Sequence, residues 1–377
     1  MSWDHGDGAL LCDIDEAPAR ARGTVEPDDP RVSVTLEVDG ERTEREHGSA
    51  DIGWAVLEDA EVRAKEPMVW LHDRIAADAT WRAGEDAFPL GPGIRRRGDR
   101  LHHDLDRVPG TLDGGRFLTS FHAAGWAHWV LDVLPRLVVD AELPPDLHRH
   151  PLLVPKFATQ RPRYRESLET FVDPDALVGL EHERLTRVRE LVWLDGARPF
   201  VHKDFRTADV PEGVPLGFHA RTMARFREAV RAAHAVGIRP DPDRRIQLVR
   251  RDGARNEASR RHNDAELEAV ARREGFEAFV LERLPFAEQV ALLASAGCIV
   301  GPYGAAWTLS FFSAPGARAL MVRPRSMVQR WLYPTLARIS GLELRALEFV
   351  PQRSDPRGAR VDPERFREAL RDLIDGP

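Results

Sequence analysis

Two side chains with acid–base chemistry lie one helical turn apart in the sequence, at His128 and Asp132. Residues four apart on a helix are neighbours, so the carboxylate can orient or charge the imidazole while the pair takes a proton from a hydroxyl group. A surface ion pair, or a histidine hydrogen-bonded in a core, gives the same spacing. Arg136 stands four residues further on and is expected on the same face. His128 and Asp132 are therefore the candidate pair for proton transfer.

A candidate anion site follows a short apolar strand expected at residues 298–300. Gly301 to Gly304 turn the chain directly after that strand, and residues 305–312 can start a helix. The free N–H groups at such a helix end attract anions, phosphate among them. Ligands of open α/β sheets sit at the carboxyl ends of the strands, where this loop is expected. A glycine-rich turn that binds nothing is the simpler alternative.

Four further polar residues could serve the same site. Arg250 and Arg251 end an expected strand and could neutralise a diphosphate, although simple solvation explains them as well. Asn263 together with Glu266 has the form of a capping box, which explains both residues without a ligand. Gln289 stands on the first turns of an expected helix, where it can face solvent.

A cluster of possible metal ligands, His102, His103, Asp104 and Asp106, stands in an expected loop. A metal-dependent hydrolase could be built on such residues. No second group stands at a recognised ligand spacing, however, and structural zinc sites need four ligands. The sequence therefore predicts no metal site.

The composition is that of a globular protein large enough for two domains. The chain has 377 residues, of which 31% are charged and 42% hydrophobic, and its net charge is −7. A single core stops growing at roughly 250–300 residues, so two domains are expected. The acidic balance and the absence of an aromatic–basic motif argue against a nucleic-acid partner. Lysine occurs only at positions 65, 156 and 203, so most cations are arginine and arginine clusters are weak signals.

The cysteines and the N-terminus favour a cytoplasmic protein. Cys12 and Cys298 suggest neither a disulfide framework nor a metal site, and the acidic N-terminus is unlike a secretion signal. Residues 289–317 carry no charge and are long enough to span a bilayer. Glycine and proline at the centre of that stretch favour a buried strand, loop and helix instead. We therefore expect no transmembrane segment, and peripheral contact with the inner face of the membrane stays open.

Strands and helices alternate along the chain, as in a doubly wound α/β fold. In the first half, the pattern predicts strands at 32–38, 117–121, 150–157 and 189–196, and helices at 126–143, 161–172 and 215–236. In the second half it predicts strands at 246–251, 277–282, 298–300, 318–323 and 342–349, and helices at 263–275, 329–339 and 361–374. Pro135 is expected to kink or end its helix, because it lacks an N–H. Residues 86–115, rich in glycine and charge, are expected as a loop or edge region.

This alternation predicts five segments. They are a polar N-terminal segment at 1–31, an α/β domain at 32–236, a linker at 237–245, a second Rossmann-like domain at 246–350, and a linker with a final helix at 351–377. The linker at 237–245 is placed where glycine, proline and charge interrupt the periodicity.

Four stretches, in this order, resemble glycosyltransferase family 61. They are GWAHWVLDVLPRL (125–137), SRRHNDAEL (259–267), LPFAEQVALLASAGCIVGPYGAA (284–306) and FFSAPGA (311–317). The resemblance extends over about residues 110–325, and the combination is more specific than any one motif.

The resemblance implies a GT-B-like fold, with two Rossmann-like domains facing each other across a cleft. It implies that the C-terminal domain binds a nucleotide-sugar and that the N-terminal domain is the acceptor side. It further implies transfer of a hexose or pentose with inversion and without a catalytic metal, the nucleotide-sugar being a co-substrate and no other cofactor taking part. Such enzymes often act in the synthesis of capsular or other surface polysaccharides.

Carried over residue by residue, the resemblance assigns catalysis to the His128 and Asp132 positions. On the donor side it matches a set of positions along the second half of the chain: Arg250, Arg251, Asn263, Gln289, Gly301 and Gly304. The loop of residues 301–305, which includes Tyr303 and Ala305, is expected to hold the donor diphosphate.

The donor loop also departs from the family pattern. The chain has Tyr303 where the family usually has a histidine, Leu309 where it has an asparagine, and Met321 where a glutamate is common. Leu309 and Met321 cannot make the hydrogen bonds of those side chains. Two hypotheses follow: an active glycosyltransferase of surface-polysaccharide synthesis, or a catalytically degenerate relative that acts as a binding or assembly partner.

Overall fold

The structure is a computed structural model that describes most of the chain. The described residues are 9–12, 17–26, 29–38, 41–49, 52–65, 68–71, 74–77, 94–97, 100–103, 107–120, 122–194, 218–250, 260–326, 331–352, 354 and 358–376. They form two compact units: unit 1 comprises residues 1–30 and 48–222, and unit 2 comprises residues 31–47 and 223–377. Each unit has its own sheet with helices packed on it. The expected α/β fold class is confirmed, and two such units are consistent with a GT-B-like arrangement.

Unit 2 contains a parallel sheet. Its strands, in spatial order, are β15 (Glu277–Phe279), β14 (Asp241–Leu248), β16 (Ala296–Pro302), β17 (Arg318–Pro324), β18 (Glu343–Phe349), β3 (Asp29–Val38) and β4 (Glu41–Ser49). Every pair from β15 to β3 is parallel. The carboxyl ends of these strands therefore meet at one edge of the sheet.

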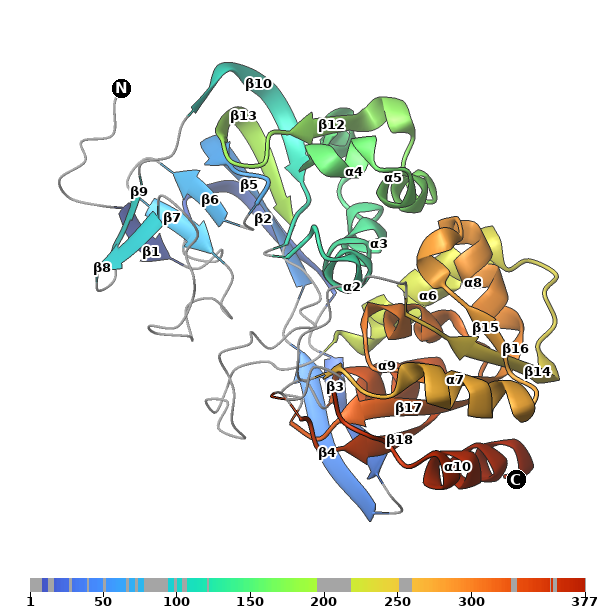
Figure 1. Cartoon of the computed structure of the whole chain (residues 1–377). Coiled ribbons are helices and arrows are strands. Elements are labelled where there is room, and N and C mark those ends of the chain that lie inside the picture. Colours follow the sequence, from blue (N-terminus) through green and yellow to red (C-terminus); the bar gives the residue numbers. More distant parts are fainter. Residues whose placement is uncertain are drawn as a thin grey trace. The chain divides into compact units, whose positions relative to one another are not determined.

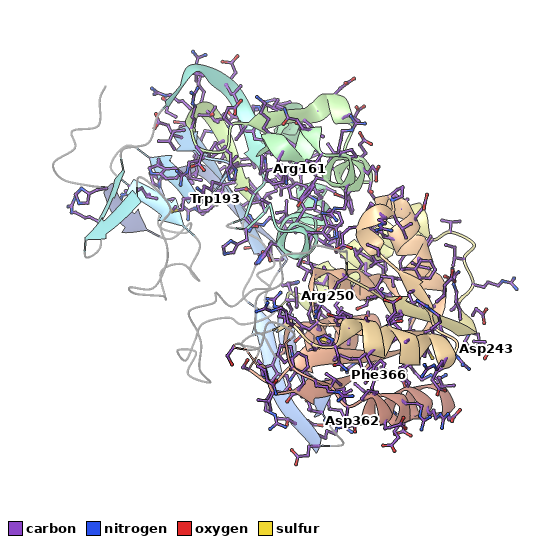
Figure 2. The ribbon with its side chains drawn as sticks, viewed as in Figure 1. Arg161, Trp193, Asp243, Arg250, Asp362 and Phe366 are labelled. Atoms are coloured by element: carbon purple, nitrogen blue, oxygen red, sulfur yellow. The ribbon has the colours of Figure 1, made fainter. Side chains whose placement is uncertain are left out.

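Helices cover both faces of this sheet, as expected for a doubly wound fold. They are α6 (Ala220–His234), α7 (Asp264–Arg273), the short η6 (Leu281–Arg283), α8 (Phe286–Ser295), η7 (Ala305–Phe312), α9 (Leu332–Ser340) and α10 (Pro363–Asp375). Apolar side chains of α7 and α10, including Phe366, pack with alternate residues of β16, β17 and β18 on one face (Figures 1 and 2). Aromatic side chains of α6, α8 and η7 contact one another in a separate cluster.

The order of the strands in unit 2 reverses at β14. The chain runs from β14 through α7 to β15 on one side of β14, and then through α8 to β16 on the other side. In open α/β sheets, ligands bind outside the carboxyl ends of the strands at such a reversal. The segments that follow β14 and β16 are therefore the place to look for a ligand site in unit 2.

The sheet of unit 1 combines parallel and antiparallel strands. In spatial order it contains β12 (Leu177–Leu180), β11 (Leu152–Pro155), β10 (Arg107–Phe117), β13 (Leu185–Leu194), β5 (Ile52–Val62), β6 (Met68–Leu71), β7 (Arg74–Ala77), β1 (Ala9–Cys12), β9 (Arg100–His103) and β8 (Ile94–Arg97), with β2 (Ala19–Glu26) also paired to β5. The strands from β12 to β13 are parallel, and β5 runs antiparallel to β13. β10 is curved (Figure 1), and its register with β13 shifts between Arg107 and Thr111.

The helices of unit 1 follow the parallel strands. They are α2 (Trp126–His128), η2 (Trp129–Val133), α3 (Arg136–Asp140), η3 (Pro145–Arg149), α4 (Lys156–Gln160), α5 (Pro162–Glu169) and η4 (Pro174–Ala176). β13 buries both of its faces: Val192 and Leu194 pack with Val139 of α3, whereas Leu191 and Trp193 belong to a second cluster with Phe117 (Figure 2 labels Trp193). This two-sided burial explains the apolar run at the end of β13.

Three elements differ from the sequence predictions. The strand expected at 32–38 as part of the first domain is β3, which pairs with β18 of unit 2. β14 already begins at Asp241, inside the stretch expected as a linker at 237–245. Of the described residues in the strand expected at 117–121, only Phe117 belongs to a strand, because β10 ends there and instead occupies part of the stretch expected as a loop or edge region. The glycines of β10 give this strand the composition of a loop. A Cβ on Gly115 would lie 2.2 Å from Leu153 Cδ1, so the close packing of β10 against β11 requires glycine there.

Within the described residues, no helix combines the length and the apolar character needed to cross a membrane.

A glycine in β16 gives a test of the unit 2 packing. A Cβ on Gly297 would lie 2.3 Å from the carbonyl oxygen of Pro242 in β14, so Gly297→Ala must push the two backbones apart. We expect the free energy of unfolding to fall by about 1–3 kcal/mol, as for other overpacked sites. Urea unfolding followed by tryptophan fluorescence measures this loss.

Gly304→Ala is the matched control for that substitution. Gly304 has an extended backbone (φ 169°), and an added Cβ meets no atom within 4 Å beyond its chain neighbours. Its urea midpoint should stay at the wild-type value. Equal midpoints for the two variants would contradict the close approach of β14 and β16.

Candidate active site

The structure joins the two acid–base residues that the sequence singles out. His128 Nδ1 lies 2.8 Å from Asp132 Oδ2, and the two side chains are 20% and 11% exposed. Because Nδ1 contacts a carboxylate, the neutral imidazole carries its proton there and its lone pair on Nε2. Arg136 is almost fully buried, and its Nη1 lies 3.5 Å from the carbonyl oxygen of Leu194. His128 and Asp132 therefore form a contact that can orient a proton acceptor.

An irregular helix holds this pair. Residues 126–128 form one α-helical turn, and residues 129–133 form a π-helical segment in which the Leu134 N–H donates to the Trp129 carbonyl at 3.0 Å. Pro135 cannot donate a hydrogen bond, and a new α-helix begins at Arg136. The expected break at Pro135 is confirmed, whereas the widened turn before it was not predicted. Such π-helical turns often occur at functional sites.

A second imidazole lies against the first. The ring centres of His122 and His128 are 4.8 Å apart. His122 is exposed and lies in the loop between β10 and α2. The sequence gives no signal for His122, because its spacing from His128 matches no regular element.

The loop after β16 is fixed by hydrogen bonds from both sides. The Tyr303 N–H donates to the Val322 carbonyl of β17 at 2.8 Å. The Trp307 indole N–H donates to the Pro302 carbonyl at 2.9 Å, and the Tyr333 hydroxyl of α9 donates to the Gly304 carbonyl at 2.7 Å. Burial raises the pKa of Tyr333, so its hydroxyl stays protonated and remains a donor. The backbone of this loop is therefore held in one conformation.

The loop leaves room at its tip. Gly304 is extended, and no atom beyond its chain neighbours lies within 4 Å of an ideal Cβ. Ala305 is exposed and starts η7, a 3₁₀ helix rather than the α-helix that the sequence suggests. The first N–H groups of a helix have no partner within it, so this end can still donate to an anion.

Two aromatic rings and an arginine surround the loop. Tyr303 is 5% exposed, and its ring packs edge-on against Tyr333 with centres 5.3 Å apart. The guanidinium carbon of Arg260 lies 5.3 Å from the centre of the Tyr303 ring. Arg260 stands in the arginine-rich motif at 259–267, but neither it nor Tyr333 was singled out from the sequence. Tyr333 gave no signal, because it reaches the loop from a distant helix.

Arg250 follows β14 at the same edge of the sheet (Figure 2). Its Nη1 lies 2.8 Å from Asp264 Oδ2, and His262 Nε2 lies 3.2 Å from Asp264 Oδ1. Burial lowers the pKa of both Arg250 and His262, and the Asp264 carboxylate opposes that shift. Arg250 is thus placed by a carboxylate as well as by its strand. Arg251 lies outside the described residues.

Asn263 and Gln289 have structural partners. The Asn263 amide donates to Glu266 Oε2 at 2.6 Å and to the Val361 carbonyl at 3.0 Å, and its oxygen accepts from the Val361 N–H. Asn263 is the N-cap residue of α7, but its side chain accepts no hydrogen bond from the backbone N–H groups of that helix, so the capping-box alternative is wrong. Gln289 is buried and donates to the Leu284 carbonyl at 2.7 Å, so the solvent-facing alternative is also wrong.

Gly301, which also belongs to the donor-side set, has a packing role in unit 2. A Cβ on Gly301 would lie 2.8 Å from both Cβ and the carbonyl oxygen of Leu248, so glycine allows β16 to approach the end of β14. That approach brings the loop after β16 and Arg250 to one edge. Leu309 and Met321, the two apolar departures from the family pattern, are 0% and 2% exposed.

No group of three or more possible metal ligands gathers among the residues that the structure describes. Of the cluster considered in the sequence, Asp104 and Asp106 lie outside those residues, as does the side chain of His103. The structure therefore does not test that cluster.

Comparison with known families identifies the class of enzyme. The family model Glycosyltransferase 61 matches residues 126–320, which include the His128–Asp132 pair and the loop after β16. The chain is therefore a glycosyltransferase, an enzyme that transfers glycosyl groups, and it belongs to the glycosyltransferase 61 family. No curated protein sequence matches the chain.

The hydrogen bond from Tyr333 to the loop can be tested without a substrate. Tyr333→Phe keeps the ring against Tyr303 but removes the donor to the Gly304 carbonyl. A net hydrogen bond contributes about 1 kcal/mol, so amide hydrogen exchange of residues 303–307 should become about fivefold faster. Mass spectrometry of the exchanged protein measures this rate.

Tyr164→Phe is the control for that experiment. It removes an equivalent hydroxyl, which donates to the Ala124 carbonyl at 2.7 Å in unit 1. Exchange at residues 303–307 should then stay at the wild-type rate. Unchanged exchange in Tyr333→Phe would show that Tyr333 does not hold the loop.

Proposed function

We propose that this glycosyltransferase moves a sugar from a nucleoside-diphosphate sugar to a hydroxyl group of a glycan, with inversion at the anomeric carbon. In one displacement, the acceptor hydroxyl loses its proton to a base and its oxygen bonds to the anomeric carbon. The bond from that carbon to the diphosphate oxygen breaks on the opposite face. The products are the extended glycan and the nucleoside diphosphate, and the base holds the proton.

The observation that carries the donor assignment is the loop at the strand-order reversal of unit 2. Open backbone at Gly304, the start of η7 and the arginines Arg250 and Arg260 gather at the edge where β14 and β16 end. Helix N–H groups and guanidinium groups are suited to a diphosphate that gains charge as it leaves. Because the loop is fixed by Trp307 and Tyr333, these donors need little reorganisation.

The His128–Asp132 pair supports the assignment of the base. An imidazole with its Nδ1 proton held by a carboxylate presents Nε2 to a hydroxyl group, and the carboxylate stabilises the imidazolium that forms. The proposed reaction needs no metal ion, because arginines and helix N–H groups can stabilise the leaving diphosphate.

The acceptor and the cellular location belong to the proposal as well. The family resemblance favours a precursor of a capsular or other surface polysaccharide as acceptor. The acidic N-terminus and the two cysteines favour a cytoplasmic enzyme, and contact with the inner face of the membrane stays open. Cys298 is a buried free thiol, which agrees with a reducing compartment.

The alternative is a catalytically degenerate family member that binds its partners without transferring sugar. Burial of Leu309 and Met321 favours it, because two positions that are polar in the family pattern offer no hydrogen bonds here. The fixed loop and the retained His128–Asp132 contact favour the active enzyme, because a degenerate site has no need of either.

Nucleotide binding separates the donor assignment from a ligand-free loop. We expect calorimetry with UDP, GDP, dTDP and CMP to show saturable binding of one nucleotide. Arg260→Gln should weaken it about tenfold, because a charge-assisted hydrogen bond to phosphate contributes about 1.5–3 kcal/mol. Arg272→Gln is the control, since Arg272 pairs with Glu268 on the exposed side of α7. No binding at millimolar nucleotide by folded protein would leave only the degenerate alternative.

The base assignment predicts a loss of turnover with intact donor binding. His128→Gln and Asp132→Asn should each lower kcat by about 10²–10⁴-fold, the usual contribution of general base catalysis. The dissociation constant of the nucleotide should not change, since both residues lie in unit 1. Transfer of radiolabelled sugar, with a metal chelator present throughout, measures the rate.

His148→Gln is the control for the base experiment. His148 Nε2 bonds the carbonyl oxygen of Asp140 in the same unit, at 2.9 Å, and has no role in the proposal. Its kcat should stay near the wild-type value. Turnover that survives His128→Gln would remove His128 from catalysis.

A further inference from the structure

A second cationic edge lies in unit 1, at the carboxyl ends of β11 and β12. Lys156 follows β11 directly, and residues 181–184 follow β12. The turn after β5 reaches the same place, because Lys65 Nζ lies 2.8 Å from Glu183 Oε1. The hydroxyl of Thr119, after β10, donates to the Ala64 carbonyl and holds that turn. Two of the three lysine positions of the chain, 65 and 156, are thus at one edge.

Glu183 has more than one cation to balance. Besides Lys65, the guanidinium of Arg63 approaches it, with Nη1 at 3.8 Å from Glu183 Oε2, and Arg63 is fully buried. The hydrogen bond from Lys65 is the main reason why the pKa of Glu183 lies below its ordinary value. The other lysine at this edge, Lys156, pairs with a different carboxylate, Glu181.

Two arginines at the start of α5 add to that charge. The guanidinium carbon of Arg161 lies 5.2 Å from the ring centre of Phe157, and that of Arg163 lies 4.2 Å from the ring of Trp126. Neither arginine makes an ion pair with any residue that the structure describes. Cations at the N-terminus of a helix oppose its dipole, so these arginines do not stabilise α5. Stacking holds each guanidinium plane while its N–H groups remain able to bind an oxyanion.

The pKa of His182 responds to the charges that lie along this edge. Its ring centre lies 6.2 Å from that of Phe157. The pKa of His182 is lowered, first by burial and then by repulsion from Lys65, Arg63 and Arg161, while Glu183 opposes the shift. Cations from two separate segments, the turn after β5 and the start of α5, therefore act on one imidazole.

The edge is linked to the candidate base by aromatic contacts within unit 1. Trp126, which carries Arg163 on its face, stands in the same helical turn as His128. The ring of Tyr164 packs edge-on against Trp126 at 5.3 Å and also lies beneath Arg161, at 5.9 Å. An anion bound by Arg161 and Arg163 would thus lie close to Trp126 and Tyr164, the aromatic side chains that pack beside the helical turn of His128.

We propose that the edge formed by Lys65, Arg161, Arg163 and His182, named here the unit 1 anion site, binds a phosphate group of the acceptor. Lys65 pairs with Glu183, whereas Arg161 and Arg163 meet no carboxylate within the described chain, and a phosphate ester can supply the missing negative charge. The acceptor is then a glycan that carries phosphate, with a hydroxyl group directed to His128. That role of His128 rests on the proposed function, whereas phosphate binding at the site does not.

Histidine ring signals in NMR spectra test the site directly. The probes are glucose 1-phosphate, for a soluble sugar phosphate, and farnesyl diphosphate, for a prenyl-linked one. Either probe should raise the pKa of His182, because a bound phosphate offsets repulsion from Lys65 and Arg161. Arg161→Gln and Lys65→Gln should each weaken the response about tenfold or more, as expected for the loss of a charge-assisted hydrogen bond.

Arg165→Gln is the matched control, because Arg165 stands on the same helix but pairs with Glu169 at 3.0 Å. Its response should equal that of the wild type. Tighter binding of farnesyl diphosphate would support a lipid-linked acceptor, and equal binding a soluble one. An unchanged His182 pKa with both probes, or affinities that ignore Arg161→Gln, would overturn the proposal.

The same protein separates this inference from the donor assignment. Nucleotide binding is measured through Arg260 in unit 2, and phosphate binding through His182 in unit 1. Loss of the first with a normal His182 response would remove the donor assignment alone. If the pKa of His182 does not change with either probe while nucleotide binding is intact, only the unit 1 anion site is ruled out.

Discussion

The site in unit 2 depends on how a few backbone groups after β16 are kept in place while Gly304 stays open. A diphosphate needs donors that point at it, yet a glycine loop tends to move because glycine is conformationally free. The chain solves this with two side chains, Trp307 and Tyr333, which donate to the carbonyl groups on either side of Tyr303. The Tyr303 N–H donates to β17, whereas the N–H of Ala305, on the same peptide as the Gly304 carbonyl, is left for a ligand.

The parallel sheet places the loop after β16 at the same edge as Arg250. β14 and β16 are neighbours although β15 lies between them in sequence, and Gly301 lets them approach closely. Arg250 and Gly301, which are 51 positions apart in the sequence, therefore lie at one edge. Two side chains that the sequence predicts on the donor side have structural partners: Asn263 ties α7 to Val361, and Gln289 ties α8 to Leu284. The proposed donor loop is thus held in place by residues that need not touch the donor.

The sequence predicts those features that a local pattern encodes. The helix break at Pro135, the spacing of His128 and Asp132, and most strands of unit 2 follow from periodicity and from a missing N–H. Long-range pairing has no such pattern. β3 joins the sheet of unit 2 by pairing with β18, more than 300 residues further along the chain. Glycine in β10 satisfies a close contact with β11 that only the folded sheet creates, so the propensity of the segment suggested a loop.

Site residues were missed for the same reason. Tyr333 and Arg260 reach Tyr303 from elements that are far from the loop in sequence, and neither stands at a spacing that marks a site. Because most cations of this chain are arginines, the sequence alone does not show which arginines belong to a site. Partners distinguish them: Arg272 and Arg165 pair with a carboxylate one turn away, as surface arginines do.

Arg161 and Arg163 are different, because they stack on aromatic rings at the positive end of α5 and meet no carboxylate within the described chain. An arrangement that opposes a helix dipole and leaves cations without counter-charges costs stability unless something offsets it. In a protein with a net charge of −7, general attraction to polyanions does not explain such a local excess. The proposed anionic ligand does, and because the proposed base His128 stands in the same helical turn as Trp126, that ligand is most simply the acceptor of a glycosyltransferase.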